Sequence, residues 1–313
     1  GKRTLTSFVF PDVLNRIDVG AFAGAGLKGS LNIPEGVVEI GPGAFIDNDF
    51  TGILTLPSTL KKIGDSAFRE CCFICPLNLP DGIEEIESGC FYNCRYLYGK
   101  LILPSHLKKL GSSAFARCSG LKGDLVIPKS LTVIPSYAFE ECGLGGRLHL
   151  HDGITTIGNG AFGHNGFKGE LDLPKSLTEL GGNNFWGNYF SGSLKIPKGL
   201  TNISEEAFSN CTFEGEVEIP EGITYIHKRA FIASENLQKV ILPSSLEFID
   251  EYAFWYCKSL RVIECKSTVP PVVNSTAFDK VPLEDLTVIV PKSALNDYKS
   301  SNFWSGLLLK TVE

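Results

Sequence analysis

Apolar and polar positions along the chain repeat with a period of 23 or 24 residues, and each period carries one phenylalanine, usually in an Ala-Phe pair. The eleven anchor phenylalanines are Phe22, Phe45, Phe68, Phe91, Phe115, Phe139, Phe162, Phe185, Phe208, Phe231 and Phe254. A fixed period of this length is the signature of a solenoid, in which each repeat forms one coil of the chain. Because one coil cannot bury its own apolar face, we expect the anchors to stack as an internal ladder.

A pair of aliphatic residues alternates with polar neighbours early in each coil, as Leu171 and Leu173 do before Pro174. This alternation predicts a short, half-buried strand, and the proline ends it because proline has no amide hydrogen to donate to a neighbouring strand. The proline stands eleven residues before the anchor in every coil except one, where His151 replaces it. We therefore expect every coil to contribute one short strand to a parallel sheet.

A second apolar pair follows the proline, as in Leu177 and Leu180, and predicts a second and shorter strand. Gly181 or another small residue comes next in most coils and is typical of a tight turn. The chain is therefore predicted to be a repeat solenoid, mostly β structure with short helical turns.

Composition and charge narrow the classes of function. An apolar share of 43% with 21 phenylalanines is enough for a continuous core and argues against intrinsic disorder. The 29 basic and 35 acidic residues leave a net charge of −6, the wrong sign for neutralising phosphates, so we expect no nucleic-acid partner. The chain contains no run of about 18 apolar residues, which predicts that it has no transmembrane segment.

The segment LKIPKGLTNISEEAFSNC, from Leu194 to Cys211, resembles the BspA-like, Treponema-type leucine-rich repeats of bacterial surface proteins. The resemblance covers about residues 5 to 265, and VPKSALNDYKSSNFWSGL, from Val290 to Leu307, is similar to the ending of such proteins from gut anaerobes. It implies a leucine-rich-repeat solenoid with a parallel sheet on its concave face. It also implies a secreted or surface protein, often an adhesin, that binds host or microbial proteins. The chain departs from the family pattern in two ways: a glycine is added before many strands, and one proline is missing. These departures leave the identity of the ligand open, because such proteins share a scaffold more than a partner.

The start of the chain bears on its location. It begins at Gly1 without an initiator methionine and without the charged-then-apolar start of a secretory signal. We interpret it as a processed or trimmed product whose export signal or lipid anchor is absent from the given chain. Together with the resemblance, this predicts an extracellular protein or one on the outer cell surface.

Two regions are predicted along the chain. Residues 1–265 form a leucine-rich-repeat solenoid of about eleven coils. After Cys265 the register breaks at STVPPVVNSTAF, then LTVIVP restores one strand, and SALNDYKSSNFW has the polar and apolar mixture of a short helix. We interpret residues 266–313 as a C-terminal cap that shields the apolar rows of the last coil.

Six of the ten cysteines stand three residues after an anchor: Cys71, Cys94, Cys118, Cys142, Cys211 and Cys257. Asn, Ala or Ser holds this position in other coils, which indicates a buried site where a free thiol acts as a small hydrophobe. In CCFIC, Cys72 and Cys75 join Cys71 in one C-x-x-C-like spacing without a second pair or a nearby histidine, so a zinc or redox site is not favoured. A local disulfide involving Cys72, Cys75 or Cys90 is an alternative if the protein is exported.

No arrangement of residues predicts catalysis, a cofactor or a metal site. His149 and His151 lie two apart on one strand and are expected to share its outward face, but no third metal ligand is evident. Glycine-rich pieces such as GLGG lack the lysine and helix of a phosphate loop. No order of Ser, His and Asp, or of Cys and His, recurs in a cleft-forming context. We therefore predict a protein that is not an enzyme.

Two rows of residues are expected to point outward from the predicted strands, because successive strand residues face opposite sides. Over four central coils both rows carry groups that can form hydrogen bonds. The predicted binding residues there are Arg147, His149, Glu170, Asp172, Lys195, Glu216 and Glu218. Ile53, Ile102, Val126 and Ile241 add apolar spots on either side. A charged centre beside apolar patches suits a protein partner, and a solvated face without function is the alternative.

Carbohydrate binding is the alternative function. The aromatic residues that suggest it are Trp186, Tyr189, Phe190, Trp255 and Tyr256, because their flat faces could stack on sugar rings. Partial burial beside the anchors is the competing interpretation, since aromatic side chains readily fill cores. A protein partner is therefore the first prediction and a glycan the second.

Overall fold

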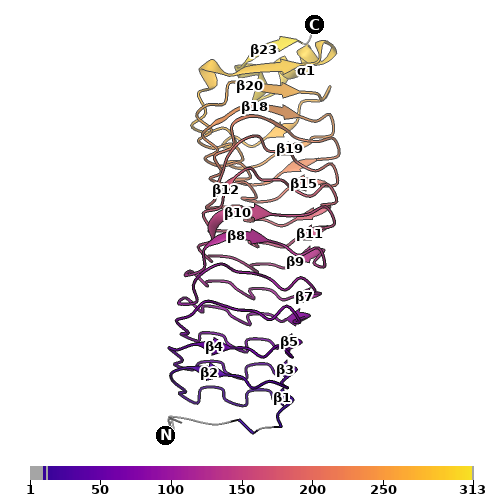
Figure 1. Cartoon of the computed structure of the whole chain (residues 1–313). Helices are drawn as coiled ribbons and strands as arrows, with labels where there is room; N and C mark the ends of the chain where they lie inside the picture. Colours follow the sequence, from indigo (N-terminus) through magenta and orange to yellow (C-terminus); the bar gives the residue numbers. More distant parts are fainter. Residues whose placement is uncertain (1–9, 12, 312–313) are drawn as a thin grey trace. The chain divides into compact units, whose positions relative to one another are not determined.

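Strands one period apart run parallel and pair through their backbones. In β8 (Gly123–Val126) and β10 (Gly145–His149), Leu125 lies opposite Leu148, and β16 (Gly215–Glu218) pairs in the same way with β18 (Leu237–Leu242) (Figure 1). In β8, β10 and β16 the buried residue is aliphatic, and its neighbours are exposed or half-buried. The chain is thus a parallel-strand solenoid, as the repeat predicts.

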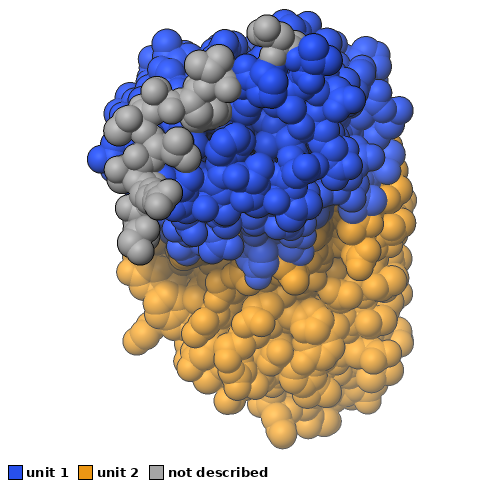
Figure 2. Space-filling view, turned by 90° about the horizontal axis from the view of Figure 1, so that it is seen from below, with its two compact units in different colours: residues 1–151, 160–167 blue, residues 152–159, 168–313 orange. Residues whose placement is uncertain are grey.

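The computed structural model describes residues 10, 11 and 13–311. Contacts divide the chain into two units, which are coloured separately in Figure 2. Unit 1 holds residues 1–151 and 160–167, and unit 2 holds residues 152–159 and 168–313. Each unit contains several successive coils and its own buried core.

The second, shorter strand forms where it is predicted, and each copy is two residues long. In unit 1 these strands are β1 (Arg16–Ile17), β3 (Glu39–Ile40), β5 (Lys62–Ile63), β6 (Glu85–Ile86), β7 (Lys109–Leu110) and β9 (Val133–Ile134). In unit 2 they are β11 (Thr156–Ile157), β13 (Glu179–Leu180), β15 (Asn202–Ile203), β17 (Tyr225–Ile226), β19 (Phe248–Ile249) and β21 (Val272–Val273). The isoleucine or leucine of nearly every pair is buried, so this ladder holds one side of the core.

The strand before the proline forms in only some coils, and the prediction of one in every coil is wrong. It is present as β2 (Leu31–Asn32), β4 (Leu54–Thr55), β8, β10, β16 and β18. Beyond the predicted coils, β20 (Val262–Cys265), β22 (Thr287–Val290) and β23 (Leu308–Thr311) extend the sheet of β16 and β18. Residues 77–79, 101–103, 171–173 and 194–196 lie outside named strands. Two-residue pairs β12 (Lys168–Gly169) and β14 (Tyr189–Phe190) join neighbouring coils just before this position. The core survives these gaps because other ladders hold the coils together.

One such ladder lies in the anchor turn, which we define as the six residues from three before to two after each anchor. Its amides donate to the carbonyls of the next coil: Gly43 N to Asp65 O (2.7 Å), Phe45 N to Ala67 O (2.9 Å) and Asp47 N to Arg69 O (3.2 Å). The residues two before and two after the anchor have positive φ, as in Gly43 and Asp47. Alternating left- and right-handed residues aim successive amides in one direction, which allows this ladder.

The anchors stack inside each unit, as predicted. In unit 1, Phe139 lies 5.8 Å from both Phe115 and Phe162, with ring planes within 4° of parallel. In unit 2, Phe231 stacks on Phe208 and Phe254 at 5.5 and 5.2 Å. Offset aromatic stacks stabilise a core beyond the burial of their area.

The anchor ladder continues beyond Cys265. Phe278 stacks on Phe254 at 5.1 Å, and Phe303 stacks on Phe278 at 5.1 Å, so two anchors follow the eleven that the period predicts. The irregular segment after Cys265 therefore interrupts the sequence register and not the stack. The role of residues 266–313 as a separate cap stays a prediction.

The last segment contains the predicted short helix, α1 (Leu295–Ser300), flanked by the 3-10 turns Leu283–Asp285, Lys292–Ala294 and Trp304–Gly306. Tyr298 on α1 and Trp304 are fully buried. The Tyr298 hydroxyl donates to the Ser267 carbonyl (3.1 Å) and the Trp304 indole donates to the Pro271 carbonyl (2.9 Å). Both polar tips of these large side chains are thus satisfied inside the core.

The glycine after the second strand begins a tight turn, as predicted: the Ala67 amide donates to the Gly64 carbonyl three residues earlier at 3.2 Å. Its small size has a second role. A Cβ placed on Gly181 would lie 2.6 Å from the Asn159 nitrogen of the preceding coil, and one on Gly64 would lie 2.5 Å from the Pro42 nitrogen. Neither distance is tolerable between real atoms. Glycine therefore lets the backbones of adjacent coils approach closely at this point.

Candidate functional site

The predicted binding residues all expose their side chains on the outward side of the strand positions, which we call the strand face. In unit 1, Arg147 and His149 stand on β10 on either side of the buried Leu148. In unit 2, Glu216 and Glu218 flank the buried Val217 on β16 in the same way. Alternation along a strand therefore places them as the sequence predicts. Glu170, Asp172 and Lys195 are exposed as well, but outside named strands.

Three of the predicted residues come together in one hollow of the strand face in unit 2. Lys195, Glu216 and Glu218 line a groove of about 640 Å³. Its other charged lining residues are Lys198, Glu214 and Glu221. Because four carboxylates and two ammonium groups line this hollow, we call it the acidic groove. Glu170 and Asp172 are not among its lining residues.

The groove lies where the sheet of unit 2 is incomplete. From β16 onward the strands pair over several residues, as between Glu216 and Lys239 and between Val217 and Val240. Between the coil of Lys195 and β16, the pairing shrinks to one isolated bridge, Lys195 with Glu218. The loss of regular pairing leaves room for a hollow, which the strand-to-strand period alone does not predict.

Lysines beside the groove hold its carboxylates in place. Lys239 Nζ lies 3.0 Å from a Glu216 oxygen and 2.9 Å from a Glu264 oxygen. Lys266 Nζ lies 2.6 Å from Glu218. Hydrogen bonds to Glu264 and Glu216 raise the pKa of Lys239, and the bond to Glu218 raises the pKa of Lys266. Two of the predicted binding residues are therefore already engaged in ion pairs.

These ion pairs also explain one wrong prediction. The prediction of Ile241 as an exposed apolar spot is wrong, because this residue is only 8% exposed. It lies between Glu218 and Glu264 in the strand register, and the Glu218–Lys266 ion pair reaches across its position. The aliphatic stems of long charged side chains commonly cover apolar surface in this way.

Of the other predicted binding residues, Arg147 and His149 lie in unit 1. The Arg147 amide nitrogen donates to Asp124 Oδ1 at 2.8 Å, and this hydrogen bond lowers the pKa of Asp124. The apolar spots Ile53, Ile102 and Val126 are exposed, as predicted. Val126 lies on β8 and Ile102 lies in the coil before it, so this part of the surface offers both polar and apolar contacts.

His151 does not share the outward face of His149, contrary to the prediction. Its Nε2 lies 3.1 Å from the carbonyl oxygens of both Pro128 and Leu131 in the preceding coil. His149 is exposed. His151 therefore ties adjacent coils at the place where other coils carry proline, because an imidazole N–H can reach carbonyls that proline cannot bind. Within residues 10, 11 and 13–311, no group of three or more His, Cys, Asp and Glu side chains could hold a metal ion.

The cysteines after the anchors are buried and free, as predicted, but each also donates a hydrogen bond. The Cys94 thiol lies 3.0 Å from the Phe68 carbonyl of the preceding coil, and the Asn165 side chain makes the same contact with Phe139 at 2.7 Å. Cysteine and asparagine therefore interchange because both can donate to an anchor carbonyl. Burial raises the pKa of Cys118 to about 12, which keeps such thiols protonated at neutral pH.

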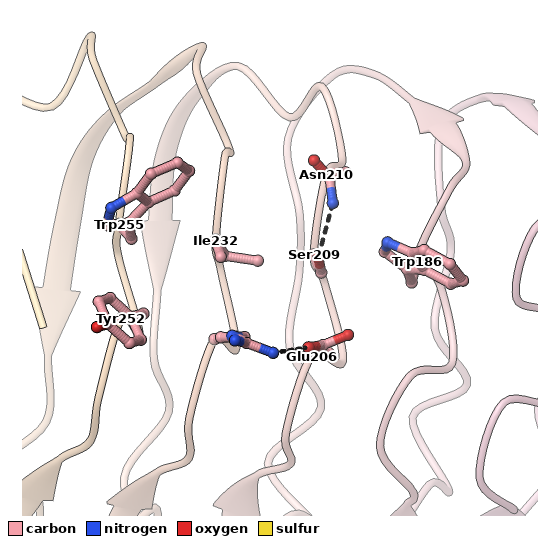
Figure 3. A pocket seen from close by; sticks show the side chains of 8 residues that line it. Trp186, Glu206, Ser209, Asn210, Ile232, Tyr252 and Trp255 are labelled. Carbon is pink, nitrogen blue, oxygen red and sulfur yellow. Dashed lines mark hydrogen bonds and ion pairs between the residues drawn. The ribbon is translucent and has the colours of Figure 1, made fainter. Parts of the chain in front are cut away.

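The aromatic candidates divide into two groups. Phe190 is fully buried and packs edge-on against Phe185, so its prediction as a sugar-stacking residue is wrong. Tyr189 is exposed on β14. Trp186 and Trp255 line one cleft of unit 2, which also includes Glu206, Ser209, Asn210, Arg229, Ile232 and Tyr252 (Figure 3). We call it the tryptophan cleft.

Sequence reasoning missed the polar residues of this cleft. Glu206, Arg229 and Tyr252 each stand two residues before an anchor, at a position of positive φ. Comparing this position across consecutive coils would have placed the three side chains in one row, next to the row of residues that directly follow the anchors.

The described part of the chain has no helix of the length and hydrophobicity that crossing a membrane requires.

A family model described as the BspA type leucine rich repeat region matches the chain in six copies, over residues 1–122, 97–211 and 188–305. A leucine-rich repeat protein from Bacteroides ovatus has 25% sequence identity and a TM-score of 0.65, with 97% of this chain and 83% of that chain covered. One from Eubacterium ventriosum has 20% identity and a TM-score of 0.46, covering 86% and 83%. A leucine rich cell surface protein from Faecalibacterium prausnitzii has 20% identity and a TM-score of 0.43, covering 80% and 76%. No curated protein matches the sequence.

Proposed function

Because the chain belongs to the family of proteins with the BspA type leucine rich repeat region, we propose that it is a non-enzymatic binding protein that recognises another protein through its strand face. Repeat solenoids commonly offer extended surfaces for binding. The resemblance to bacterial surface proteins supports a place outside the cell or on its outer surface, where host or microbial proteins are the partners.

The acidic groove is the observation that carries this proposal. It brings together Lys195, Glu216 and Glu218, which are three of the binding residues predicted from the sequence. Lys239 and Lys266 pair with Glu216 and Glu218, and the lining residues Glu214 and Glu221 remain to attract exposed Lys or Arg side chains of a partner surface. Arg147, His149, Glu170 and Asp172 stay predicted contacts.

The experiment is a binding assay of the whole chain against an array of purified extracellular-matrix and bacterial surface proteins, followed by kinetics on the strongest binder. We expect the variant Glu216→Gln/Glu218→Gln to weaken binding by about tenfold, mainly through slower association. Binding should also weaken at high salt, because exposed charges are screened.

Glu205→Gln is the matched control, since Glu205 is an exposed glutamate of the anchor turn and lies outside the groove. It should bind like the unmodified chain. Equal binding by the groove variant, with an unchanged melting temperature, would refute the groove as the site. The combined variant Arg147→Ala/His149→Ala would then test the surface of unit 1.

A further inference from the structure

The tryptophan cleft has aromatic ends and a polar middle. Trp186 and Trp255 each follow an anchor and stand on the outer two of four successive coils, with the smaller Ser209 and Ile232 in the equivalent places between them (Figure 3). At a coil spacing of about 4.8 Å, the two indoles are about 15 Å apart. The cleft has a volume of about 530 Å³, within the usual range for small-molecule sites.

Backbone and stacking contacts hold the Trp255 end in a defined position. The Trp255 ring stacks on Tyr256 at 4.9 Å with 21° between the planes, and Lys258 Nζ lies 3.8 Å above the centre of the Tyr256 ring. The Trp255 amide donates to the Tyr252 carbonyl at 3.0 Å. A ring that is already ordered loses little conformational entropy when a ligand stacks on it.

Donors and acceptors alternate in the middle of the cleft. Arg229 Nη1 donates to Glu206 Oε1 at 3.1 Å, and the Asn210 amide donates to the Ser209 hydroxyl at 2.9 Å. The guanidinium and the carboxylate are partly exposed, at 43% and 20% of their side chains, so both retain sites for a ligand. Their charges cancel, which selects against strongly anionic or cationic ligands.

We propose that the tryptophan cleft binds a neutral oligosaccharide that lies along the stack of coils. A sugar ring has an apolar C–H face that packs on an indole, and its hydroxyls both donate and accept hydrogen bonds. Glu206 would accept from a hydroxyl and Arg229 would donate to one, while Trp186 and Trp255 hold the ring faces at either end. This site is separate from the acidic groove and does not depend on the protein-binding proposal.

Other ligand classes fit the cleft less well. A quaternary ammonium group needs aromatic rings gathered closely around it, whereas these indoles stand three coils apart. A proline-rich peptide also docks on aromatic grooves, but its prolines have no N–H to donate to the oxygen of Glu206 that Arg229 leaves open.

The test uses the whole chain and four neutral probes: cellotetraose, xylotetraose, maltotetraose and N,N′,N″,N‴-tetraacetylchitotetraose. Binding is measured by tryptophan fluorescence and by calorimetry. The chain has three tryptophans, and Trp304 is buried, so a fluorescence change reports on Trp186 and Trp255. We expect at least one probe to bind, and Trp186→Ala to raise its Kd by about tenfold or more.

Two further variants separate recognition from folding. Glu206→Gln keeps the size of the side chain and should weaken the same probe by about threefold to tenfold. Tyr189→Ala removes an exposed aromatic side chain outside the cleft and should bind normally. The proposal fails if none of the four probes binds at millimolar concentration, or if Trp186→Ala binds as well as the unmodified chain. Binding of a polyproline peptide instead of the sugars would also overturn it.

Discussion

The Cys257 thiol lies 3.3 Å from the carbonyl oxygen of Phe231, the anchor of the preceding coil, and donates a hydrogen bond to it. Cysteine or asparagine makes the equivalent bond in Cys71, Cys94, Cys118, Cys142, Asn165 and Cys211. Ser234 stands at the same position one coil before Cys257. Its hydroxyl is buried and, among the described residues, lacks a hydrogen-bond partner. A serine hydroxyl is shorter than a thiol or an amide, so it falls short of the carbonyl.

Replacing Ser234 with cysteine should therefore stabilise the protein. The longer thiol can reach the Phe208 carbonyl, and an added buried hydrogen bond contributes about 1 kcal/mol. Thermal melting measures the change. Ser234→Ala is the control, because it removes the unsatisfied hydroxyl without adding a donor. Ser234→Cys melting no higher than Ser234→Ala would show that the ladder position does not need a donor.

Phe139→Ala should loosen unit 1. The ring stacks on Phe115 and Phe162 and is fully buried, so its removal leaves a cavity that touches two neighbouring coils. Such truncations cost about 3 to 5 kcal/mol. Val133→Ala, at a half-exposed valine, should change the melting temperature little. A melting temperature of Phe139→Ala equal to that of the control would contradict an internal role for the ring.

Thiol titration should find one accessible cysteine in the native protein and ten after denaturation. Nine of the ten cysteines are buried, and only Cys72 is partly exposed. Burial also raises the pKa of Cys71 to about 12, so little reactive thiolate exists there at neutral pH. A thiol reagent that changes absorbance on reaction measures the count. Cys72→Ser should abolish the fast reaction; fast labelling of two or more sites would show that the ladder opens readily.

Ala233→Gly should stabilise the anchor turn. Ala233 has a φ of 56°, a left-handed conformation that disfavours a Cβ by about 1 to 2 kcal/mol. The extra freedom of glycine in the unfolded chain offsets part of this, so the expected gain is up to about 1 kcal/mol. Ala230→Gly in the same turn should instead destabilise, because that buried methyl group packs in the core. Equal losses in the two variants would argue against strain at Ala233.

Stability should fall on acidification through carboxylates that tie neighbouring coils. The Ser244 amide and hydroxyl donate to Glu221 at 3.0 and 2.8 Å, and the amide hydrogen bond is the main cause that lowers the pKa of Glu221. A lowered folded-state pKa stabilises the protein above the unfolded value of about 4.3, and this contribution is lost as the pH falls through the folded-state pKa. Between pH 5 and pH 3, about one unit either side of the unfolded pKa, we expect the melting temperature of Glu221→Gln to fall less than that of the unmodified chain. Identical pH profiles would exclude a contribution from this carboxylate.

The spacing of the anchors was enough to predict the solenoid and the stacked rings, and the apolar pair after the proline predicted the second strand. A strict period places equivalent residues in equivalent environments, so a pattern that repeats from Phe22 to Phe254 specifies how one coil meets the next. The same logic placed Glu216 and Glu218 on the outward face, because strand alternation depends only on local backbone geometry.

Only the tertiary structure decided where strand pairing between coils is incomplete, which exposed positions are covered, and where a groove or cleft forms. The coil of Lys195 makes only one bridge to β16, and a groove remains there. The packing of these two coils, and not the period, determines how fully they pair. Ile241 is covered because an ion pair from two other coils crosses it. The tryptophan cleft exists because the side chains between Trp186 and Trp255 are smaller than the indoles, and only stacking brings residues so distant in the chain into one surface. The period determines which residues share a position, while packing between coils determines what space remains around them.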